Sequence, residues 1–315
     1  MAVRTRSLIS IDDLSDTDLR RIVERGRRFA DGERAAPLAG KVVGTYFAKT
    51  STRTRTAFSS GALRLGAGVV PYGPGDLQTN TGETYEDTGR VFARMLDVLV
   101  ARTAGDPAQL RGWAAEGGMS VVNAMTADEH PTQALADLTT LLGHFGRLED
   151  LRLLYIGEGN NTAAALALAL TRIEGFEFEV RTPPGYGLDP AIAARARNQA
   201  EASKGAFAER HDMDELPEAL DVIYTTRWQT TGTTKPDPNW REIFAPFQVV
   251  RDLWQTSPEA VFMHDLPAHR GEEVTSEVLD GPQSIAFQQA ANKMYSAMAV
   301  LEWCQGTDTE VDQRT

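Results

Sequence analysis

The chain has 315 residues, of which 42% are hydrophobic and 24% are charged. This is an ordinary globular composition, and the length suggests two domains. With 32 Lys and Arg against 44 Asp and Glu, the formal charge is −12, so the protein as a whole repels nucleic acid and anionic membranes. A local basic site therefore needs an explanation of its own.

Cysteine and histidine usage excludes further classes. The single cysteine, Cys304, allows no intramolecular disulfide, which fits a reducing cytoplasm. Residues 1–23 lack the apolar stretch of a secretory signal, and the longest apolar run, 163–170, is too short to cross a bilayer. The five histidines form no metal-binding pair. We expect a cytoplasmic protein without membrane or nucleic-acid partners, metal or cofactor.

Strand-like apolar runs alternate with helical segments along the chain, which predicts parallel β-α-β units and an α/β fold. Four segments in the first half are predicted to be buried strands: 41–48, 66–73, 97–103 and 120–125. Four more strands are predicted in the second half: 151–157, 176–182, 219–226 and 260–267. A helix is expected over 84–95, where Thr84 and Asp87 have capping-box spacing.

Two domains are expected, with boundaries placed by composition and by the crossing segment "HFGRLEDL". The first spans 1–145 and the second 146–283, followed by a final helix at about 284–304 that packs back on the first domain. Residues 305–315 form a polar tail. Residues 227–240, a long Gly/Pro/Thr loop after a strand, have the character of a functional loop.

The stretch "STRT" at 51–54 follows a strand and opens a helix. Helix-start N–H groups, hydroxyls and a guanidinium together suit a phosphate. We assign Arg53 to an anion and Arg55 to a structural ion pair, because residues two apart point to different sides of a helix. The spacing is equally consistent with an N-capped helix bearing surface arginines.

Two further features have both a functional and a structural interpretation. Arg102 ends a predicted strand, where ligands bind in parallel sheets, but an ordinary strand-end arginine explains it as well. His130 and Gln133 share one face of a helix that starts with proline, as a carbonyl-binding pair or as a capping cluster. By themselves, these spacings favour the structural interpretations.

"GEGNN" at 157–161 is a partial dinucleotide fingerprint, since Thr162 stands at the place of the third glycine. We interpret it as a loop that offers Asn160 and Asn161 to a polar ligand. The cluster "HDLPAHR" at 264–270 follows a strand and is suited to proton handling or to an interface ion-pair network.

Taken together and in this order, "STRTRT", "HPTQ", "GEGNN" and "HDLPAHRGEEVTSEVLDGPQS" resemble the aspartate/ornithine carbamoyltransferase superfamily over nearly the whole chain. The pattern "LPAHRGEEV" is closer to the ornithine branch. The resemblance implies two doubly wound parallel-sheet domains with the active site in the cleft between them. It also implies catalytic trimers, in which a loop of one subunit completes the site of its neighbour.

The resemblance implies site residues for both substrates. Those expected to bind carbamoyl phosphate are Ser51, Thr52, Arg53, Thr54, Arg102, His130, Gln133, Lys293 and, reaching over from a neighbour, Gln78. Those expected to bind the acceptor are Asn161, Thr226, Arg227, Gln229, Thr230, Asp265 and Leu266. Thr54, Arg102, His130 and Asp265 are the expected catalytic residues. The first domain is then the carbamoyl-phosphate-binding domain and the second the acceptor-binding domain.

The acceptor half departs from the ornithine pattern. Asp265 stands where ornithine enzymes have cysteine, and Thr226, Thr230 and Thr231 occupy the Asp, Ser and Met places of their acceptor loop. Thr226, Arg227 and Gln229 instead resemble the aspartate branch, whose arginine grips an acceptor carboxylate.

The donor half departs from the family pattern at two places. Gly82 replaces the lysine of the neighbour-reaching loop, and Lys293 replaces an arginine that touches the donor.

We therefore expect carbamoyl transfer from carbamoyl phosphate to the amine of a small amino-acid-type acceptor, with ornithine first. The alternatives are a non-ornithine acceptor, such as another diamino acid or a ureido or guanidino compound, and a non-catalytic metabolite-binding relative. A nucleotide-dependent oxidoreductase resting on "GEGNN" is a further alternative, which NAD binding would distinguish.

Overall fold

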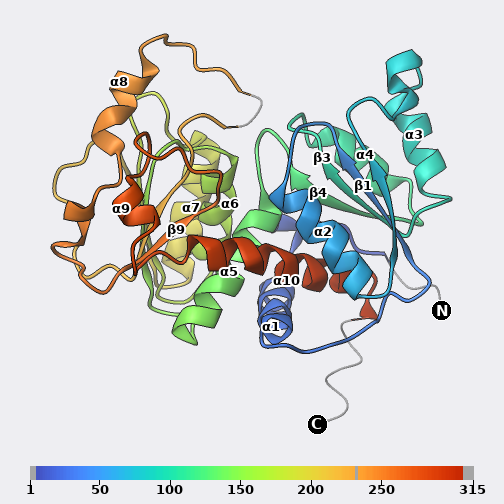
Figure 1. Ribbon diagram of the computed structural model, residues 1–315, viewed down its shortest axis with the longest axis horizontal. Helices are drawn as coiled ribbons and strands as arrows, with labels where there is room; N and C mark the ends of the chain where they lie inside the picture. Colours follow the sequence, from blue (N-terminus) through green and yellow to red (C-terminus); the bar gives the residue numbers. More distant parts are fainter. Residues whose placement is uncertain (1–4, 231–232, 308–315) are drawn as a thin grey trace. The chain divides into compact units, whose positions relative to one another are not determined.

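The computed structural model describes residues 5–230 and 233–307. It divides into two units (Figure 1). The first comprises Met1–Gly143 and Ala291–Thr315, and the second His144–Ala290. Helix α10 (Ala286–Cys304) contributes residues to both. Most of the polar tail, residues 308–315, lies outside the described residues.

The first unit is built on a parallel sheet of order β2-β1-β3-β4. Its strands are β1 (Val42–Phe47), β2 (Gly68–Tyr72), β3 (Val98–Arg102) and β4 (Ser120–Met125). Its helices are α1 (Asp16–Ala30), α2 (Arg53–Arg64), α3 (Tyr85–Phe92), α4 (Ala108–Ala115) and α5 (Pro131–Phe145), whose last two residues fall in the second unit. Trp113 centres one apolar cluster, with the rings of Tyr46 and Phe92 both 6.2 Å away.

The second unit has a five-stranded parallel sheet of order β7-β6-β5-β8-β9. Its strands are β5 (Arg152–Ile156), β6 (Glu177–Arg181), β7 (Ala206–Arg210), β8 (Val222–Thr225) and β9 (Val261–His264). Its helices are α6 (Asn161–Leu170), α7 (Pro190–Ala202), α8 (Trp240–Phe244) and α9 (Ser276–Leu279). Every residue of α6 is buried, as its Ala- and Leu-rich sequence predicts.

The predicted α/β class with two parallel-sheet domains is confirmed, and all eight predicted strands form. Two details differ. The strand at 66–73, expected to be buried, is the edge strand β2 and is largely exposed. Strand β7 was not predicted, because its sequence "AFAER" contains two alanines and two charged residues and therefore no apolar run. It lies at the edge of the second sheet.

The strand order fixes where ligands are expected in each unit. In both sheets the chain winds outward in one direction and then in the other, so a topological switch point lies between β1 and β3 and another between β5 and β8. Open parallel sheets bind ligands at the carboxyl ends of the strands beside such a point. Within the described residues, no helix is long and apolar enough to span a membrane.

Candidate active site

The carboxyl ends of β1 and β3 bring two groups of predicted donor residues to one sheet edge. Phe47 is the register partner of Arg102, and the N–H of Ala48 donates to the carbonyl oxygen of Arg102 at 3.0 Å. Residues 51–54 follow β1 and run into α2. The predicted anion-binding segment and Arg102 therefore leave the sheet at the same switch point.

The first turn of α2 is not closed by its own N-cap side chain. Thr52 occupies the N-cap position with a helical backbone conformation, and its hydroxyl makes no capping hydrogen bond. The alternative of a helix capped by this threonine therefore does not apply. Helix-start N–H groups without a side-chain cap, at the positive end of the helix dipole, are suited to an anion.

Arg55, the second arginine of this segment, contacts the last residues of β1 and β2. Arg55 donates from Nη2 to the carbonyl oxygen of Tyr72 at 3.4 Å, and its guanidinium lies 5.3 Å from the ring centre of Phe47. The partners found for Arg55 are thus a carbonyl and an aromatic face, rather than the carboxylate expected of a structural ion pair. Thr54 is buried and accepts from Nη1 of Arg102 at 3.5 Å.

His130 lies between β4 and α5 and is buried. Its Nδ1 lies 3.3 Å from the hydroxyl of Thr132. Burial holds the pKa of His130 well below its ordinary value, and the positive charges of Lys293 and Arg102 act in the same direction. His130 is therefore a neutral imidazole at pH 7, close to two cations that a substrate anion would neutralise.

Gln133 and Lys293 form one buried polar network. Lys293, on α10, donates from Nζ to Oε1 of Gln133, and Nε2 of Gln133 donates to Oδ1 of Asp137 at 2.7 Å. The amide of Gln133 is thus oriented by a cation on one side and a carboxylate on the other. The sequence predicts Gln133 and Lys293 separately as donor-binding residues. Their hydrogen bond is seen only in the folded structure.

Gln78 opens a short 3-10 helix, η2 (Gln78–Thr81), and is exposed. Its side-chain oxygen accepts from the hydroxyl of Thr81 at 3.0 Å. This local contact holds the side chain at its own turn. A role in a neighbouring subunit stays a prediction.

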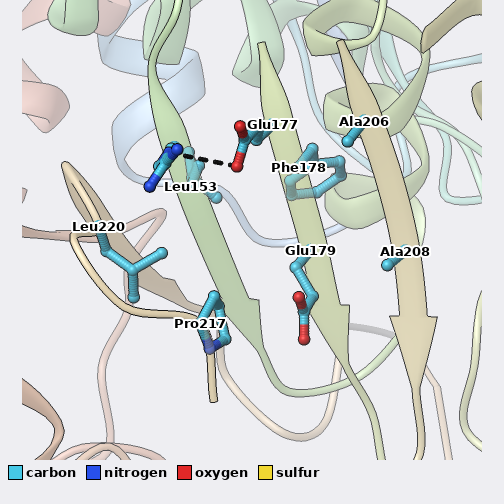
Figure 2. Close-up of a pocket in the computed structure, with 9 residues that line it drawn as sticks. Leu153, Glu177, Phe178, Glu179, Ala206, Ala208, Pro217 and Leu220 are labelled. Atoms are coloured by element: carbon cyan, nitrogen blue, oxygen red, sulfur yellow. Dashed lines mark ion pairs between the residues drawn. The ribbon is translucent and has the colours of Figure 1, made fainter. Parts of the chain in front are cut away.

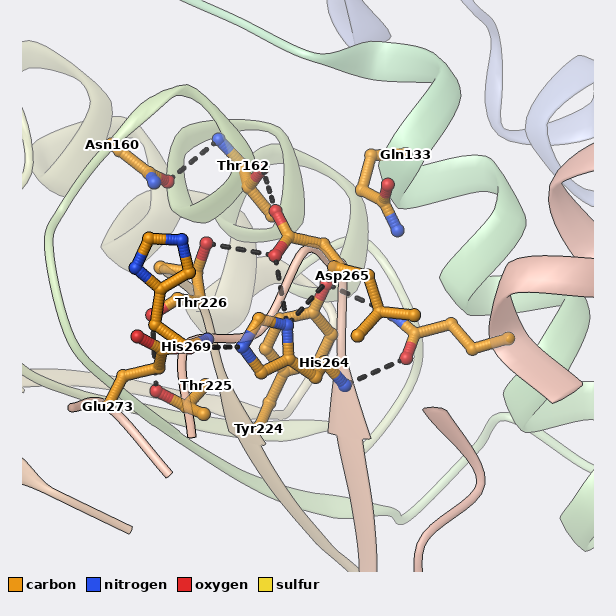
Figure 3. A network of polar contacts seen from close by, with 12 residues as sticks. Gln133, Asn160, Thr162, Tyr224, Thr225, Thr226, His264, Asp265, His269 and Glu273 are labelled. Atoms are coloured by element: carbon orange, nitrogen blue, oxygen red, sulfur yellow. Dashed lines mark hydrogen bonds and ion pairs between the residues drawn. The ribbon is translucent and has the colours of Figure 1, made fainter. Parts of the chain in front are cut away.

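In the second unit, the predicted acceptor residues follow β5, β8 and β9, three adjacent strands. Asp265 lies at the centre of their polar contacts (Figure 3). Its Oδ1 accepts from the hydroxyl of Thr226 and its Oδ2 from the hydroxyl of Thr162, both at 3.0 Å. The sequence pattern predicts no binding role for Thr162, which only replaces a glycine of the dinucleotide fingerprint. Its distance from Asp265 along the chain gives no indication of this contact.

His264 orients the turn that follows β9. Its Nδ1 accepts from the backbone N–H of Leu266 at 2.8 Å, and Nε2 lies 3.3 Å from Oε1 of the fully buried Glu273 (Figure 3). Burial lowers the pKa of His264, but hydrogen bonds with Asp265 and Glu273 and their negative charges outweigh it, so the pKa is raised above its ordinary value. The polar cluster predicted from the sequence contains His264 and Asp265 but not Glu273.

The loop after β8 is tied to the turn after β5. Thr230 donates to Oε2 of Glu158 at 3.2 Å and accepts from Nδ2 of Asn160 at 3.0 Å. Lys235 forms an ion pair with Oε1 of Glu158, and its ammonium lies 4.8 Å from the ring centre of Tyr186. Thr231, the third threonine of this loop noted in the sequence, lies outside the described residues.

The two asparagines of "GEGNN" have separate positions. Asn160 caps α6, accepting from the N–H groups of Thr162 and Ala163, so its carbonyl oxygen serves the fold. Asn161 is the first residue of α6 and is buried. Of the two, Asn161 therefore stays as the candidate acceptor-binding residue.

Two predicted acceptor residues lie just beyond β8. Nε of Arg227 is buried and makes no hydrogen bond with the described residues. Gln229 donates from Nε2 to the carbonyl oxygen of Thr233 at 2.8 Å, which stabilises the loop. A buried donor without a partner is costly, so Arg227 is suited to an anionic group of a ligand.

One pocket of the second unit lies at the opposite ends of its strands (Figure 2). It is lined by Leu153, Phe178 and neighbouring residues near the amino ends of β5, β6 and β7, and the ion pair of Arg152 with Glu177 borders it at 3.2 Å. Since ligands of parallel sheets bind at the carboxyl ends, this pocket is not the acceptor site. Over residues 5–230 and 233–307, no group of three or more His, Cys, Asp or Glu side chains is placed to hold a metal ion.

Comparison with known protein families matches both halves of the chain. Residues 6–142 match the carbamoyl-P binding domain of aspartate/ornithine carbamoyltransferase, and residues 149–304 match the Asp/Orn binding domain. Among curated proteins, the ornithine carbamoyltransferase of Gloeobacter violaceus is 38% identical over 295 residues, which cover 93% of this chain and 94% of the relative. The anabolic ornithine carbamoyltransferase of Pyrococcus furiosus is 36% identical over 306 residues, 96% of each chain.

Solved structures give the same result. The ornithine carbamoyltransferase from Pyrococcus furiosus superposes with a TM-score of 0.90 at 35% identity, covering 97% of this chain and 99% of that one. The enzyme from Gloeobacter violaceus gives 0.86 at 36% identity, covering 96% and 100%. The similarity therefore extends over both units.

Proposed function

The chain belongs to the aspartate/ornithine carbamoyltransferase family and is a carbamoyltransferase, and we propose that it carbamoylates the amine of a small amino acid, with ornithine the first candidate. Carbamoyl phosphate is the donor and phosphate the second product. The predicted donor residues all belong to the first unit and the predicted acceptor residues all belong to the second.

The observation that carries the proposal is the cationic cluster around His130. Arg102 and Lys293 both lie close enough to lower the pKa of this buried histidine, and Arg102 also contacts Thr54. A doubly charged acyl phosphate, in which a phosphate oxygen is bonded to a carbonyl carbon, matches such a cluster. Its anion is suited to the helix start at 51–54, and its carbonyl oxygen to the donors of Thr54, Arg102 and His130.

The reaction follows from the charges that develop. The neutral amine attacks the carbamoyl carbon, a C–N bond forms, and negative charge builds on the carbonyl oxygen. The C–O bond to phosphate then breaks, and the amine loses one proton. Thr54, Arg102 and neutral His130 stabilise the oxyanion as hydrogen-bond donors, and Arg53 with the start of α2 stabilises the departing phosphate. These roles require no covalent intermediate.

The acceptor half supports an amino acid with a carboxylate and an amine. Nε of Arg227 is a buried donor without a hydrogen-bond partner among the residues that the structure describes, and Asp265 brings a carboxylate. Both of the similar enzymes named above act on ornithine according to their names. Another diamino acid, or a ureido or guanidino compound, is the alternative, because Asp265 and Thr226 depart from the ornithine pattern.

We also propose a trimer in which Gln78 serves the neighbouring subunit. Five of the six exposed large apolar side chains among the described residues support an interface on the first unit: Leu63, Val70, Tyr85, Val91 and Met95. Exposed apolar side chains on neighbouring elements are typical of subunit contacts. A cytoplasmic location and a place in arginine biosynthesis are parts of the same proposal.

The test is an acceptor screen with the purified full-length protein. Carbamoyl phosphate is incubated with ornithine, aspartate and a panel of diamino, ureido and guanidino compounds, and both phosphate release and a mass gain of one carbamoyl group are measured. We expect stoichiometric phosphate and carbamoylated ornithine. Binding of carbamoyl phosphate without turnover on any amine would instead support a non-catalytic relative.

The control variant lies on the same helix as the predicted phosphate ligand. Arg53→Ala should reduce kcat/KM by at least about 100-fold, since it removes a charged transition-state partner. Arg64→Ala, in the exposed last turn of α2, should leave it within about 2-fold. Equal kinetics of the two variants would overturn the phosphate assignment.

A further inference from the structure

The loop after β8 is anchored to a cluster of four aromatic rings in the second unit: Tyr186, Trp228, Trp240 and Phe244. Phe244, at the end of α8, is fully buried. The ring of Trp228, near the start of the loop, lies 5.6 Å from it, and the ring of Trp240, where α8 begins, lies 5.8 Å from it. The same aromatic cluster therefore holds the beginning of the loop and the helix to which the loop leads.

Lys235 brings a positive charge from this loop into the aromatic cluster. Its ammonium lies 4.8 Å from the ring centres of both Tyr186 and Phe244, and its side chain is only 3% exposed. Aromatic faces attract a cation, and more strongly where water is excluded. Burial lowers the pKa of Lys235, and the charge and hydrogen bond of Glu158 oppose this shift. A buried ammonium is costly without a carboxylate, so this ion pair is the contact that the position requires.

Glu158 connects Lys235 to a predicted acceptor residue. Its Oε1 pairs with the ammonium, and its Oε2 accepts from the hydroxyl of Thr230 at 3.2 Å. Nδ2 of Asn160 donates to the same hydroxyl oxygen at 3.0 Å. Glu158 and Asn160 follow β5 and Thr230 follows β8, which are adjacent strands. One chain of contacts thus runs from the aromatic cluster to the carboxyl ends of the strands where the acceptor is expected.

We propose that Lys235 is a positioning residue for the acceptor amino acid: its ammonium, enclosed by Tyr186 and Phe244, orients Glu158, which in turn holds Thr230 at the acceptor site. This inference rests on the proposed function and adds a residue for which the sequence pattern predicts no role. Lys235 acts through Glu158 and does not itself contact the substrate. A lysine that only stabilised the fold would affect both substrates alike.

The first experiment separates the two substrates. Lys235→Met retains the length of the side chain and its apolar contact with the rings but removes the charge. We expect KM for ornithine to rise at least about 5-fold, as for loss of one hydrogen-bonded contact, with KM for carbamoyl phosphate within about 2-fold. The matched control is Lys204→Met, because Lys204 pairs with Glu174 at 2.8 Å on the exposed surface of the same unit. It should leave both KM values within about 2-fold. Equal rises for both substrates in Lys235→Met, or no rise for ornithine, would overturn the assignment.

A double-mutant cycle tests whether Lys235 acts through Glu158. Glu158→Gln retains an oxygen that Thr230 can contact and removes the charge that Lys235 orients. This variant alone should also raise KM for ornithine. In the Glu158→Gln background, Lys235→Met should then change KM by less than about 2-fold further, since residues in one network are not additive. A double variant whose rise in KM equals the product of the two single rises would show that the residues act independently.

Hydrogen exchange distinguishes this inference from the proposed function, because it needs no turnover. Exchange of the ligand-free protein is followed by mass spectrometry at residues 157–161 and 226–230, with α7 as the reference. Lys235→Met should accelerate exchange in both segments at least about 5-fold and leave α7 unchanged, as expected for local opening. If this acceleration is seen while no amine is carbamoylated, the positioning of the loop stands and the proposed reaction does not. If wild type carbamoylates ornithine and the two segments exchange equally in both proteins, the inference fails and the proposed reaction stands.

Discussion

Glu129 and His130 are adjacent buried residues that are both driven toward their neutral forms. Burial raises the pKa of Glu129 to about 7 even though the N–H of Ile11 donates to its Oε1 at 2.7 Å. Burial likewise holds the pKa of His130 well below its ordinary value. Because desolvation penalises the charged form of either group, an acid and a base shift in opposite directions.

Glu129 should make the first unit less stable as pH rises. Its pKa is raised to about 7 in the folded protein against an ordinary value of 4.5, so the folded state holds a proton that the unfolded state releases. The stabilisation is complete below pH 4.5 and is lost as pH rises through 7, by about 3 kcal/mol in total. In Glu129→Gln, which cannot ionise, this component should be absent.

The measurement is urea unfolding of both proteins at pH 5.5 and pH 8. The stability of Glu129→Gln relative to wild type should increase toward pH 8, because only wild type pays the cost of ionisation there. The contributions of all other titrating groups to the free energy of unfolding cancel when the two proteins are compared at the same pH. A difference that is the same at both pH values would contradict the raised pKa.

His130 should contribute to catalysis as a neutral donor, without titrating near neutral pH. The pKa of His130 lies well below its ordinary value. Titration of His130 should therefore cause no rise or fall of kcat/KM between pH 6 and 9. His130→Gln should lower kcat about 100-fold, as for loss of an oxyanion donor, and should leave the shape of the profile unchanged. Loss of an acidic limb in the variant would show that the histidine titrates.

At the scale of elements, the acceptor loops depend on one close backbone approach. A Cβ at Gly159 would lie 2.3 Å from the backbone carbon of Gly187 and from the nitrogen of Leu188, while the N–H of Gly159 donates to the carbonyl oxygen of Tyr186 at 2.8 Å. Backbone atoms cannot move aside as a flexible side chain can. This turn also carries Glu158 and Asn160, which hold the loop after β8.

Gly159→Ala should therefore lower both stability and acceptor affinity. We expect a loss of about 1–3 kcal/mol from overpacking and a raised KM for the acceptor with an unchanged KM for carbamoyl phosphate. The matched control is Gly112→Ala in the exposed part of α4, where a Cβ would meet nothing within 4 Å. That change should stabilise by about 0.5–1 kcal/mol. Thermal unfolding and substrate kinetics of both variants test the contrast.

Element prediction succeeded where the pattern was strong and local. Apolar runs gave all eight predicted strands, and the hydroxyl of Thr84 accepts from the N–H of Asp87 as the capping spacing predicts. Strand β7 was missed and the burial of β2 was wrong because both lie at sheet edges. Edge position is decided by strand order, which local composition does not contain.

At the scale of the whole molecule, shared active sites predict complementation between two inactive variants. Arg53→Ala and Gln78→Ala are unfolded, mixed in equal amounts and refolded together. If Gln78 of one subunit serves the site of another, roughly a quarter of the sites in random trimers combine both intact residues. We expect activity to return to that level, while each variant refolded alone stays inactive. Light scattering should give the mass of a trimer, and a lack of complementation would contradict shared sites.

The sequence by itself determined the α/β class and the family, because these rest on local apolar runs and on motifs in a fixed order. Only the tertiary structure decided how the sites are held. It joined Lys293 to Gln133 across 160 positions and Thr162 to Asp265 across 103, and it buried His130 beside two cations. Such contacts depend on strand order and burial, and spacing along the chain carries no information about either.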